Sequence, residues 1–304
     1  MFKVHILGCS SATPTRRHTP SCQIVDYRGN LMMVDCGEGA QRQMRIQGLK
    51  FSRLRHIFIS HLHGDHIFGL PGLLSTMALH EKGGRLTIHT FAEGIQLLKP
   101  MMDFFCGETP FEIEWSEVRP GERYTIVDMP SLSVETIPLD HRVPCTGYLF
   151  REKPKERHLN GELARFFNIP VRDLAAIKAG ADWVRPETGE VIANARLTTP
   201  ADPSLAYAYC SDTRPSDKVV DAVSGVNLLY HEATYGDDNK ELAWPRGHST
   251  AREAGEIARR AGVDRLVIGH YSKRYRDERI LVEQAAEAFG GEVIAANEGM
   301  IIDV

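Results

Sequence analysis

The chain has 304 residues, of which 42% are hydrophobic and 25% charged, and its 36 basic and 40 acidic side chains give a formal net charge of -4. This balance excludes disordered and collagen-like classes. It also argues against indiscriminate coating of nucleic acid, because such binding depends on many Lys and Arg contacts with phosphates. No apolar run approaches the ~18 residues that a membrane span requires. We therefore expect a cytoplasmic protein with no membrane segment.

Short apolar runs alternate with longer amphipathic stretches, which is typical of an α/β protein. In chain order, the first half predicts strands at 3–7, 21–27 and 31–34, a helix at 39–46, a strand at 56–60, a helix at 72–80, a strand at 86–90 and a helix at 92–105. The second half predicts strands at 131–139, 145–150, 206–210 and 227–230, a helix at 249–261, a strand at 265–268, a helix at 277–289 and a strand at 299–303. Ser249 is the expected hydroxyl N-cap of the helix at 249–261. This number of strands suggests two sheets.

One stretch breaks the alternation. Residues 151–200 are polar and charged, contain several prolines and glycines, and interrupt what would otherwise be neighbouring strands. We therefore expect a single domain over 1–304 with an inserted arm at about 151–200.

The most informative segment is His61–His66, which directly follows a strand-like apolar run. Residues two apart on an extended segment point the same way, so His61 and His63 can share one ion. Asp65 and His66 lie beyond the next bend and can face a second ion. The spacing differs from the His-Glu-x-x-His of single-zinc metalloprotease helices. Imidazole with carboxylate favours Zn²⁺, with Mn²⁺ and Fe²⁺ as alternatives.

Three further candidate ligands, His141, Asp212 and His270, each follow the end of a predicted strand. Strand ends converge at one edge of a sheet, where α/β proteins commonly bind ligands. The resulting set of five histidines and two aspartates is enough for two metal ions. Asp212 is the expected bridge, because a carboxylate offers two oxygens and an imidazole one lone pair. The remaining histidines without such a setting are expected to be structural or exposed: His5, His18, His56, His80, His89 and His158.

Seven segments spread over nearly the whole chain resemble the ribonuclease Z family of the metallo-β-lactamase superfamily. They are Leu7–Pro14, Asp35–Gln43, His61–His66, Ser211–Pro215, His231–Thr234, Gly247–Thr250 and Gly269–Tyr275. The histidine motif alone indicates only the superfamily. The segment after Asp35, the His-Glu-Ala-Thr string and the segment that contains His270 are more specific to the family.

This resemblance implies a four-layer αββα sandwich of two mixed sheets, a homodimer, and an arm that binds the elbow of transfer RNA. It implies two Zn²⁺ per subunit, one held by His61, His63 and His141, the other by Asp65, His66 and His270, with Asp212 bridging. It further implies that Asp65 accepts a proton and that His248 and Glu232 lie near the scissile phosphate. His248 could then donate a proton to the leaving oxygen while Glu232 orients its ring. The alternative role for His248 is to cap the helix that begins near Ser249.

The function implied is a zinc-dependent endoribonuclease that removes the 3′ trailer from precursor transfer RNA, leaving a 3′-hydroxyl on the RNA and a 5′-phosphate on the trailer. The enzymatic alternative is a phosphodiesterase for small or cyclic phosphodiesters on the same fold. An oxygen-reducing diiron protein is disfavoured, because that branch typically has glutamate at the position of His63. A non-catalytic RNA-binding scaffold would require lost ligands, and all seven are present.

Two basic stretches lie close in sequence to the predicted ligands. Arg42, Arg45, Lys50, Arg53 and Arg55 precede the histidine motif, and Lys273, Arg274, Arg276 and Arg279 follow His270. They predict a basic rim around the metal site, suited to a phosphate backbone. The stretch Asn168–Gly180 lacks the Gly-Pro element usual in the arm of this family, and the sequence predicts nothing about treatment of a CCA end.

Overall fold

The computed structural model describes residues 1–79, 84–107 and 109–304 and divides into two compact units. The main unit consists of Met1–Asp128, Ser133–Phe150 and Leu205–Val304. The arm unit consists of Met129–Leu132 and Arg151–Ser204, and it contains the stretch that the sequence identifies as an insertion.

The first sheet of the main unit has seven strands and is formed mainly by the N-terminal part of the chain. Its order is β18 (Ile301–Asp303), β1 (Phe2–Gly8), β2 (Cys22–Tyr27), β3 (Asn30–Val34), β4 (Leu54–Phe58), β5 (Arg85–Thr90) and β6 (Glu112–Glu117). Pairing is antiparallel from β18 to β3 and parallel from β3 to β6. The helices between these strands are α1 (Ala40–Ile46), α2 (Gly64–Ile67), α3 (Leu70–Ala78) and α4 (Ala92–Cys106), and a short 3-10 helix, η1, spans Phe51–Arg53.

The second sheet also has seven strands. Its order is β17 (Glu292–Ala295), β16 (Arg265–Gly269), β15 (Leu228–Glu232), β14 (Ala206–Cys210), β9 (Thr146–Glu152), β8 (Leu132–Pro138) and β7 (Thr125–Asp128). Strands β14 to β17 are parallel, whereas β7 and β8 are antiparallel. The associated helices are α8 (Asp217–Ala222), α9 (Lys240–Arg246), α10 (Ala251–Ala261) and α11 (Arg279–Phe289), and η2 spans Asp237–Asn239.

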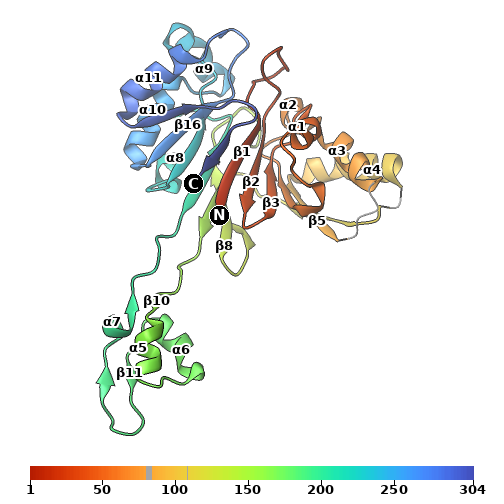
Figure 1. Ribbon diagram of the computed structural model, residues 1–304. Coiled ribbons are helices and arrows are strands. Elements are labelled where there is room, and N and C mark those ends of the chain that lie inside the picture. The colour runs from red at the N-terminus through yellow and green to blue at the C-terminus, as the bar shows by residue number, and fades with distance from the viewer. Residues whose placement is uncertain (80–83, 108) are drawn as a thin grey trace. The chain divides into compact units, whose positions relative to one another are not determined.

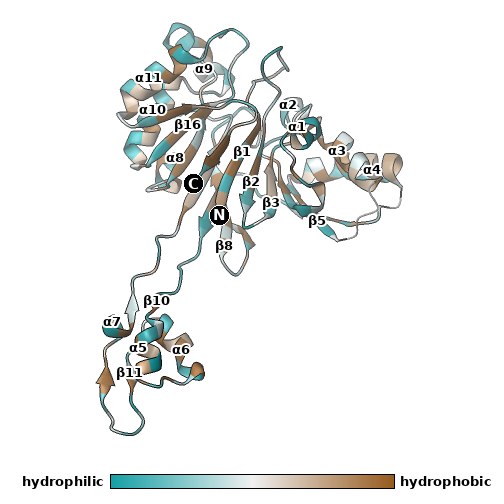
Figure 2. Ribbon diagram, viewed as in Figure 1, coloured by the Kyte–Doolittle hydropathy of each residue, from teal (hydrophilic) through white to brown (hydrophobic). Residues whose placement is uncertain are grey.

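Helices lie on the outer side of each sheet in the main unit, which gives the layer order helix, sheet, sheet, helix (Figure 1). Many strand residues are apolar, and polar residues are frequent in the loops and on parts of the outer helices (Figure 2). This arrangement buries the apolar faces of both sheets. It confirms the predicted four-layer sandwich of two mixed sheets.

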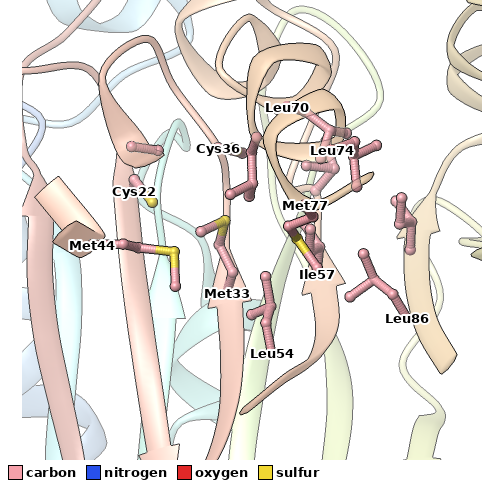
Figure 3. Packing of buried hydrophobic residues seen from close by; sticks show 14 of the residues in the cluster. Cys22, Met33, Cys36, Met44, Leu54, Ile57, Leu70, Leu74, Met77 and Leu86 are labelled. Atoms are coloured by element: carbon pink, nitrogen blue, oxygen red, sulfur yellow. The ribbon is translucent and has the colours of Figure 1, made fainter. Parts of the chain in front are cut away.

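Apolar side chains from the first sheet pack against α1 and α3 (Figure 3). Met33 and Ile57 come from neighbouring strands, while Met44, Leu70 and Leu74 come from the helices, and all five are fully buried. Burial of side chains of this size contributes about 1.5–3 kcal/mol each. The core therefore fixes β3, which leads to Asp35, and β4, which leads into the histidine motif.

The predicted elements of the main unit are present, with boundaries within two residues of those predicted. Strand β4 ends at Phe58 instead of 60, because the amide of Ser60 donates to Asp35 Oδ1 (2.7 Å). Helix α3 begins at Leu70, two residues earlier than expected, and His80 lies outside the described residues. None of the helices in the described ranges is both long and apolar enough to cross a membrane.

The start of α10 also differs, and the expected cap at Ser249 is wrong. The N-cap is Thr250, which forms a reciprocal capping box with Glu253. The Ser249 hydroxyl instead donates to the carbonyl of Thr213 (2.6 Å). Since the cap is one residue further on, His248 does not cap this helix.

The arm unit has a small core of its own. Its short strands pair as β10 (His158–Leu159) with β13 (Thr198–Thr199) and β11 (Trp183–Val184) with β12 (Val191–Ile192). Its helices are α5 (Gly161–Phe166), α6 (Val171–Lys178) and α7 (Asn194–Leu197). Phe167, Ile177, Trp183 and Leu197 are buried together, and the Asn194 amide donates to the carbonyls of Ile177 and Ala181 (2.7 and 2.8 Å).

Candidate metal centre

Three neighbouring parallel strands place polar residues at one edge of the second sheet. Cys210 of β14 is in register with His231 of β15, and Glu232 with Gly269 of β16. Asp212, Glu232 and His270 therefore meet where these strands end. Asp212 and His270 both have positive φ, 57° and 60°. Such a backbone is uncommon for residues other than glycine and is often found at functional sites, where the surrounding contacts hold it.

The structure brings all seven predicted metal ligands together. They form two groups. Within each group, every residue offers one possible ligand atom, and these atoms all lie within 4.8 Å of one another. The groups are His61, His63, His141 and Asp212, and Asp65, His66 and His270. This grouping agrees with the two sets that the family resemblance implies.

Asp212 lies between the two groups. Its Oδ1 is 3.9 Å from Nε2 of His61, and its Oδ2 is 3.2 Å from Nε2 of His66 and 3.3 Å from Nε2 of His270. The two oxygens of one carboxylate thus face different histidine sets. A carboxylate in this position is suited to bridge two metal ions.

Hydrogen bonds orient the histidine rings through their other nitrogen. His66 Nδ1 pairs with Asp35 Oδ2 (2.7 Å), and His141 Nδ1 with the carbonyl of Gly247 (2.7 Å). His270 Nδ1 pairs with the Thr234 hydroxyl (2.9 Å). Such partners fix the ring and direct Nε2 toward a metal.

Asp35 is the most extensively bonded of these supporting groups. Besides His66, its carboxylate accepts from the amide and hydroxyl of Ser60 (2.7 and 2.9 Å) and from the hydroxyl of Tyr209 (2.8 Å). Asp35 is fully buried and has a φ of 57°. The sequence indicates it only as part of the family segment, without this orienting role.

Buried ring nitrogens without partners show that the site suits a metal ion. Nε2 of His66 and Nε2 of His270 are buried and have no hydrogen-bond partner in the part of the chain that the structure describes. A buried polar atom left unpaired costs about 1–3 kcal/mol. A cation coordinated by these nitrogens and by Asp212 would remove that cost, and the donor set of imidazole and carboxylate matches zinc.

The charge states also favour metal binding. Burial lowers the pKa of His61, His63 and His141, so these rings are neutral and keep a lone pair. Burial would also lower the pKa of His66, but the carboxylates of Asp35 and Asp212 outweigh it and raise that pKa. The surroundings of His66 thus favour a positive charge at its unpaired Nε2, whether from a proton or from a metal ion.

His248 and Glu232 form a second pair beside the ligands. Nδ1 of His248 lies 2.9 Å from Oε1 of Glu232, which also accepts from the amide of Thr213 (2.9 Å). Burial disfavours the charged ring, yet Glu232 more than compensates and raises the pKa of His248 to about 9. Burial tends to raise the pKa of Glu232, but His248 outweighs it and lowers that pKa. The pair is therefore a protonated imidazole held by a buried carboxylate.

A cavity of about 400 Å³ opens onto the ligands. His63, Asp65, Asp212, His248 and His270 form part of its wall. The rest comes from residues of the family segments, Ser11, Ala12, Pro14, Glu38 and Gly64, and from three residues outside those segments, Pro20, Phe68 and Arg142.

Ala12 contacts the site through its backbone. Its amide donates to Oδ2 of Asp65 (2.7 Å), and its φ is 62°. Since the contact uses a main-chain group, no side-chain pattern in the sequence could have indicated it.

The two predicted basic stretches do not supply the cation in this cavity. Arg45, Lys50 and Arg55 line a separate cavity of about 470 Å³. Lys273 and Arg276 line another of about 380 Å³. Among the described residues, Arg142 is the one Lys or Arg side chain in the wall of the metal cavity, so neither basic stretch contributes to this wall.

Comparisons with known proteins agree with this architecture. A family model described as "Anti-Pycsar protein Apyc1" matches residues 2–101. A ribonuclease Z from Parabacteroides distasonis is 51% identical over 303 residues, which is 100% of this chain and 99% of the relative. The crystal structure of human tRNase Z, short form, matches with a TM-score of 0.71 and 25% identity over 99% of both chains.

The metallo-β-lactamase fold protein YhfI from Bacillus subtilis matches with a TM-score of 0.66 and 18% identity, over 99% of this chain and 98% of the other. At that identity the likeness concerns the fold alone. The full-length identity to a ribonuclease Z, together with a sandwich fold shared with tRNase Z, leads to one conclusion: this chain belongs to the ribonuclease Z family.

Proposed function

We propose that this chain is a zinc-dependent endoribonuclease that removes the 3′ trailer from precursor transfer RNA. The observation that carries the proposal is that the seven predicted metal ligands and the His248–Glu232 pair gather beside one cavity, whose wall includes His63, Asp65, Asp212, His248 and His270, in a chain 51% identical to a ribonuclease Z. Hydrolysis would leave a 3′-hydroxyl on the transfer RNA and a 5′-phosphate on the trailer.

We assign His61, His63 and His141 to one metal ion, Asp65, His66 and His270 to a second, and Asp212 to both. Two Zn²⁺ ions would supply a water of lowered pKa and offset charge on the phosphate oxygens. The chain's own groups set the rest of the geometry. The ring partners described above direct Nε2 of His66, His141 and His270 inward, so little reorganisation is needed when substrate binds.

Asp65 is suited to accept the proton of the attacking water. The amide of Ala12 holds its Oδ2, which leaves Oδ1 for the proton. Burial would raise the pKa of Asp65, but the rings of His270 and His66, whose Nε2 atoms lie 3.6 and 3.5 Å from its Oδ2, outweigh it and keep that pKa below the usual range. The carboxylate is therefore ionised.

His248 is suited to protonate the 3′-oxygen that leaves. Its Nδ1 is engaged by Glu232, so Nε2 is the nitrogen available to the cavity that the ring lines. A raised pKa, about 9, keeps the ring protonated near neutral pH. Glu232 acts through His248 and is a positioning residue.

The arm unit is our candidate for contact with the body of the transfer RNA. Its helices α5 and α6 carry the cations Arg165, Arg172 and Lys178, and Phe166 and Val171 are exposed at 73% and 84%. Cations and exposed aromatic side chains together suit a folded RNA. An R165A/R172A variant should raise KM for precursor transfer RNA more than kcat falls.

A homodimer is the proposed assembly. Leu97, Phe104 and Phe105 of α4 are exposed at 55%, 82% and 68%. Exposed apolar groups of this size commonly mark protein interfaces. Sedimentation equilibrium should give twice the mass of the chain for the wild type and a lower mass for F104D.

One experiment separates the proposed function from the small-phosphodiester alternative. The purified metal-loaded protein is given 3′-extended precursor transfer RNA and bis(p-nitrophenyl) phosphate in parallel, each with and without a chelator. We expect kcat/KM for the RNA to exceed that for the small diester by orders of magnitude, and both activities to be lost with chelator. Preference for the small diester would support the alternative instead.

A further inference from the structure

Two residues in the wall of the metal cavity have no role in holding metal or moving protons. Phe68 follows α2 directly and is 72% exposed, although it is a large apolar side chain. Arg142 follows the ligand His141, and its side chain is exposed. Both line the same cavity of about 400 Å³ as His63, Asp65 and His248.

The ring of Phe68 lies against the backbone of the histidine motif. A Cβ at Gly64 would come within 2.3 Å of Phe68 Cε2, so the ring packs directly on this glycine. This contact anchors the side chain at the cavity while most of its surface stays open to solvent. Exposed aromatic rings in nucleic-acid sites bind bases by stacking, which is worth about 1–3 kcal/mol per base.

Arg142 is a cation without an acidic partner. Across the described ranges its guanidinium makes no ion pair and no hydrogen bond, whereas nearby Arg214 is bound to Asp140 (3.0 Å). The Cγ of Arg142 lies 3.2 Å from where a Cβ at Gly247 would stand, so its stem packs at this left-handed glycine. Glu38 is the one wall residue of opposite charge besides the metal-site carboxylates.

We propose that Phe68 and Arg142 form a nucleotide-binding pair at the metal centre. Phe68 stacks on a base next to the scissile phosphate, and Arg142 binds a phosphate of the RNA backbone. The ligand class is a polynucleotide strand, because a small diester lacks either the base or the second phosphate. This inference rests on the proposed function and deepens it, by naming what makes the site prefer RNA.

The variants for the test are chosen in pairs. R142A removes the cation, and R142K keeps the positive charge but lacks the planar guanidinium group. F68L keeps an apolar contact with Gly64 but has no aromatic face, and F68Y keeps that face. R259A is the matched control, since Arg259 is exposed near the end of α10 and lies outside the walls of the cavities described.

The measurement is kcat/KM of the metal-loaded enzyme for precursor transfer RNA over a range of salt concentrations, with bis(p-nitrophenyl) phosphate as the reference substrate. R142A should lower the RNA-to-diester ratio about tenfold and reduce the slope of log kcat/KM against log salt by about 0.7 to 0.9, the loss of one phosphate contact. F68L should lower the ratio about tenfold with the slope unchanged. R142K should keep the wild-type slope against log salt, and F68Y should keep the wild-type RNA-to-diester ratio. R259A should match the wild type in both.

The failure of this inference is distinct from failure of the proposed function. If the wild type cleaves the RNA and neither R142A nor F68L changes the ratio, the nucleotide-binding pair does not exist. A slope change of equal size in R259A would assign the effect to net charge and overturn the role of Arg142. If F68L alters the sedimenting mass while the ratio stays constant, Phe68 serves an interface. If the wild type does not cleave the RNA at all, the proposed function itself fails.

Discussion

Oε1 of the fully buried Glu232 lies 2.9 Å from Nδ1 of His248. The same carboxylate accepts from the amides of Thr213 and Thr234 (2.9 and 3.2 Å). Glu232 is therefore held in place by the loops that follow β14 and β15. Its position fixes the ring of His248 and the nitrogen that the ring presents to the cavity.

Removal of His248 should slow the hydrolysis of substrates with poor leaving groups most. His248→Ala is expected to lower kcat for precursor transfer RNA by about 10²- to 10⁴-fold, because the 3′-oxygen needs a proton as it leaves. Hydrolysis of bis(p-nitrophenyl) phosphate should fall far less, since p-nitrophenolate leaves without one. Steady-state rates on both substrates check this. Equal losses of rate on precursor transfer RNA and on bis(p-nitrophenyl) phosphate would show that His248 does not act as a proton donor.

Loss of the Asp35 charge should weaken one metal site. Asp35→Asn keeps the shape and a side chain that tolerates positive φ, but it weakens the bond that orients His66. We expect metal affinity to fall about 10- to 100-fold for one ion. Titration of the metal-free protein with Zn²⁺ measures this. Tyr209→Phe, which removes only one partner of Asp35, is the control and should keep both ions.

His18 should stabilise the fold more at low pH. It pairs with Glu298 (2.8 Å) and Glu278 (3.1 Å), and Arg17 also pairs with Glu278 (2.7 Å). Its hydrogen bond with Glu298 outweighs burial and raises its pKa above the usual 6.5. A raised folded-state pKa means that the stabilisation is fully present below the unfolded pKa and is lost as pH rises through the folded pKa.

The variant that checks this is His18→Gln. It should lower the free energy of unfolding by about 1.5–3 kcal/mol at pH 6, the range for hydrogen bonds to charged groups. The difference from the wild type should shrink at high pH. Urea unfolding at pH 6 and at pH 9.5 gives both values, and a difference independent of pH would contradict the charged state of His18.

The capping box of α10 gives a prediction about stability alone. Thr250→Ala removes the hydroxyl that accepts from the amide of Glu253 (3.2 Å). We expect a loss of about 1 kcal/mol in the free energy of unfolding, while Thr250→Ser should lose little. Thermal unfolding of the two variants and the wild type tests this. If Thr250→Ala melts at the same temperature as the wild type, the cap is not needed for stability.

Most strands were predictable because each carries an apolar run that the core requires. The strands that the sequence did not predict in the main unit are β6, β7 and β17, and each lies at an edge of its sheet. Edge strands are partly exposed and carry charges, as in the alternating Glu112–Glu117. β6 and β7 therefore lack the continuous apolar run of a central strand, whereas the apolar residues Val293, Ile294 and Ala295 of β17 are only partly buried.

The metal ligands were predictable from local sequence, but their surroundings were not. His61 to His66 form a dense local pattern, and the other ligands follow apolar strands. Ala12 contributes only a main-chain amide, and Phe68 and Arg142 adjoin ligands in sequence but have no ligand chemistry of their own that would indicate them. Similarly, the partners of His18 are about 260 and 280 residues away in sequence, so its buried ion pairs leave no local signal.

The most direct test of the account is to map the cut in a 3′-extended precursor transfer RNA. The wild type with Zn²⁺ should cut once at the junction with the trailer, giving a 3′-hydroxyl and a trailer with a 5′-phosphate. Chelator and Asp212→Ala should abolish that cut. Cleavage that survives chelation, or a product that ends in a 2′,3′-cyclic phosphate, would contradict metal-dependent hydrolysis at this centre.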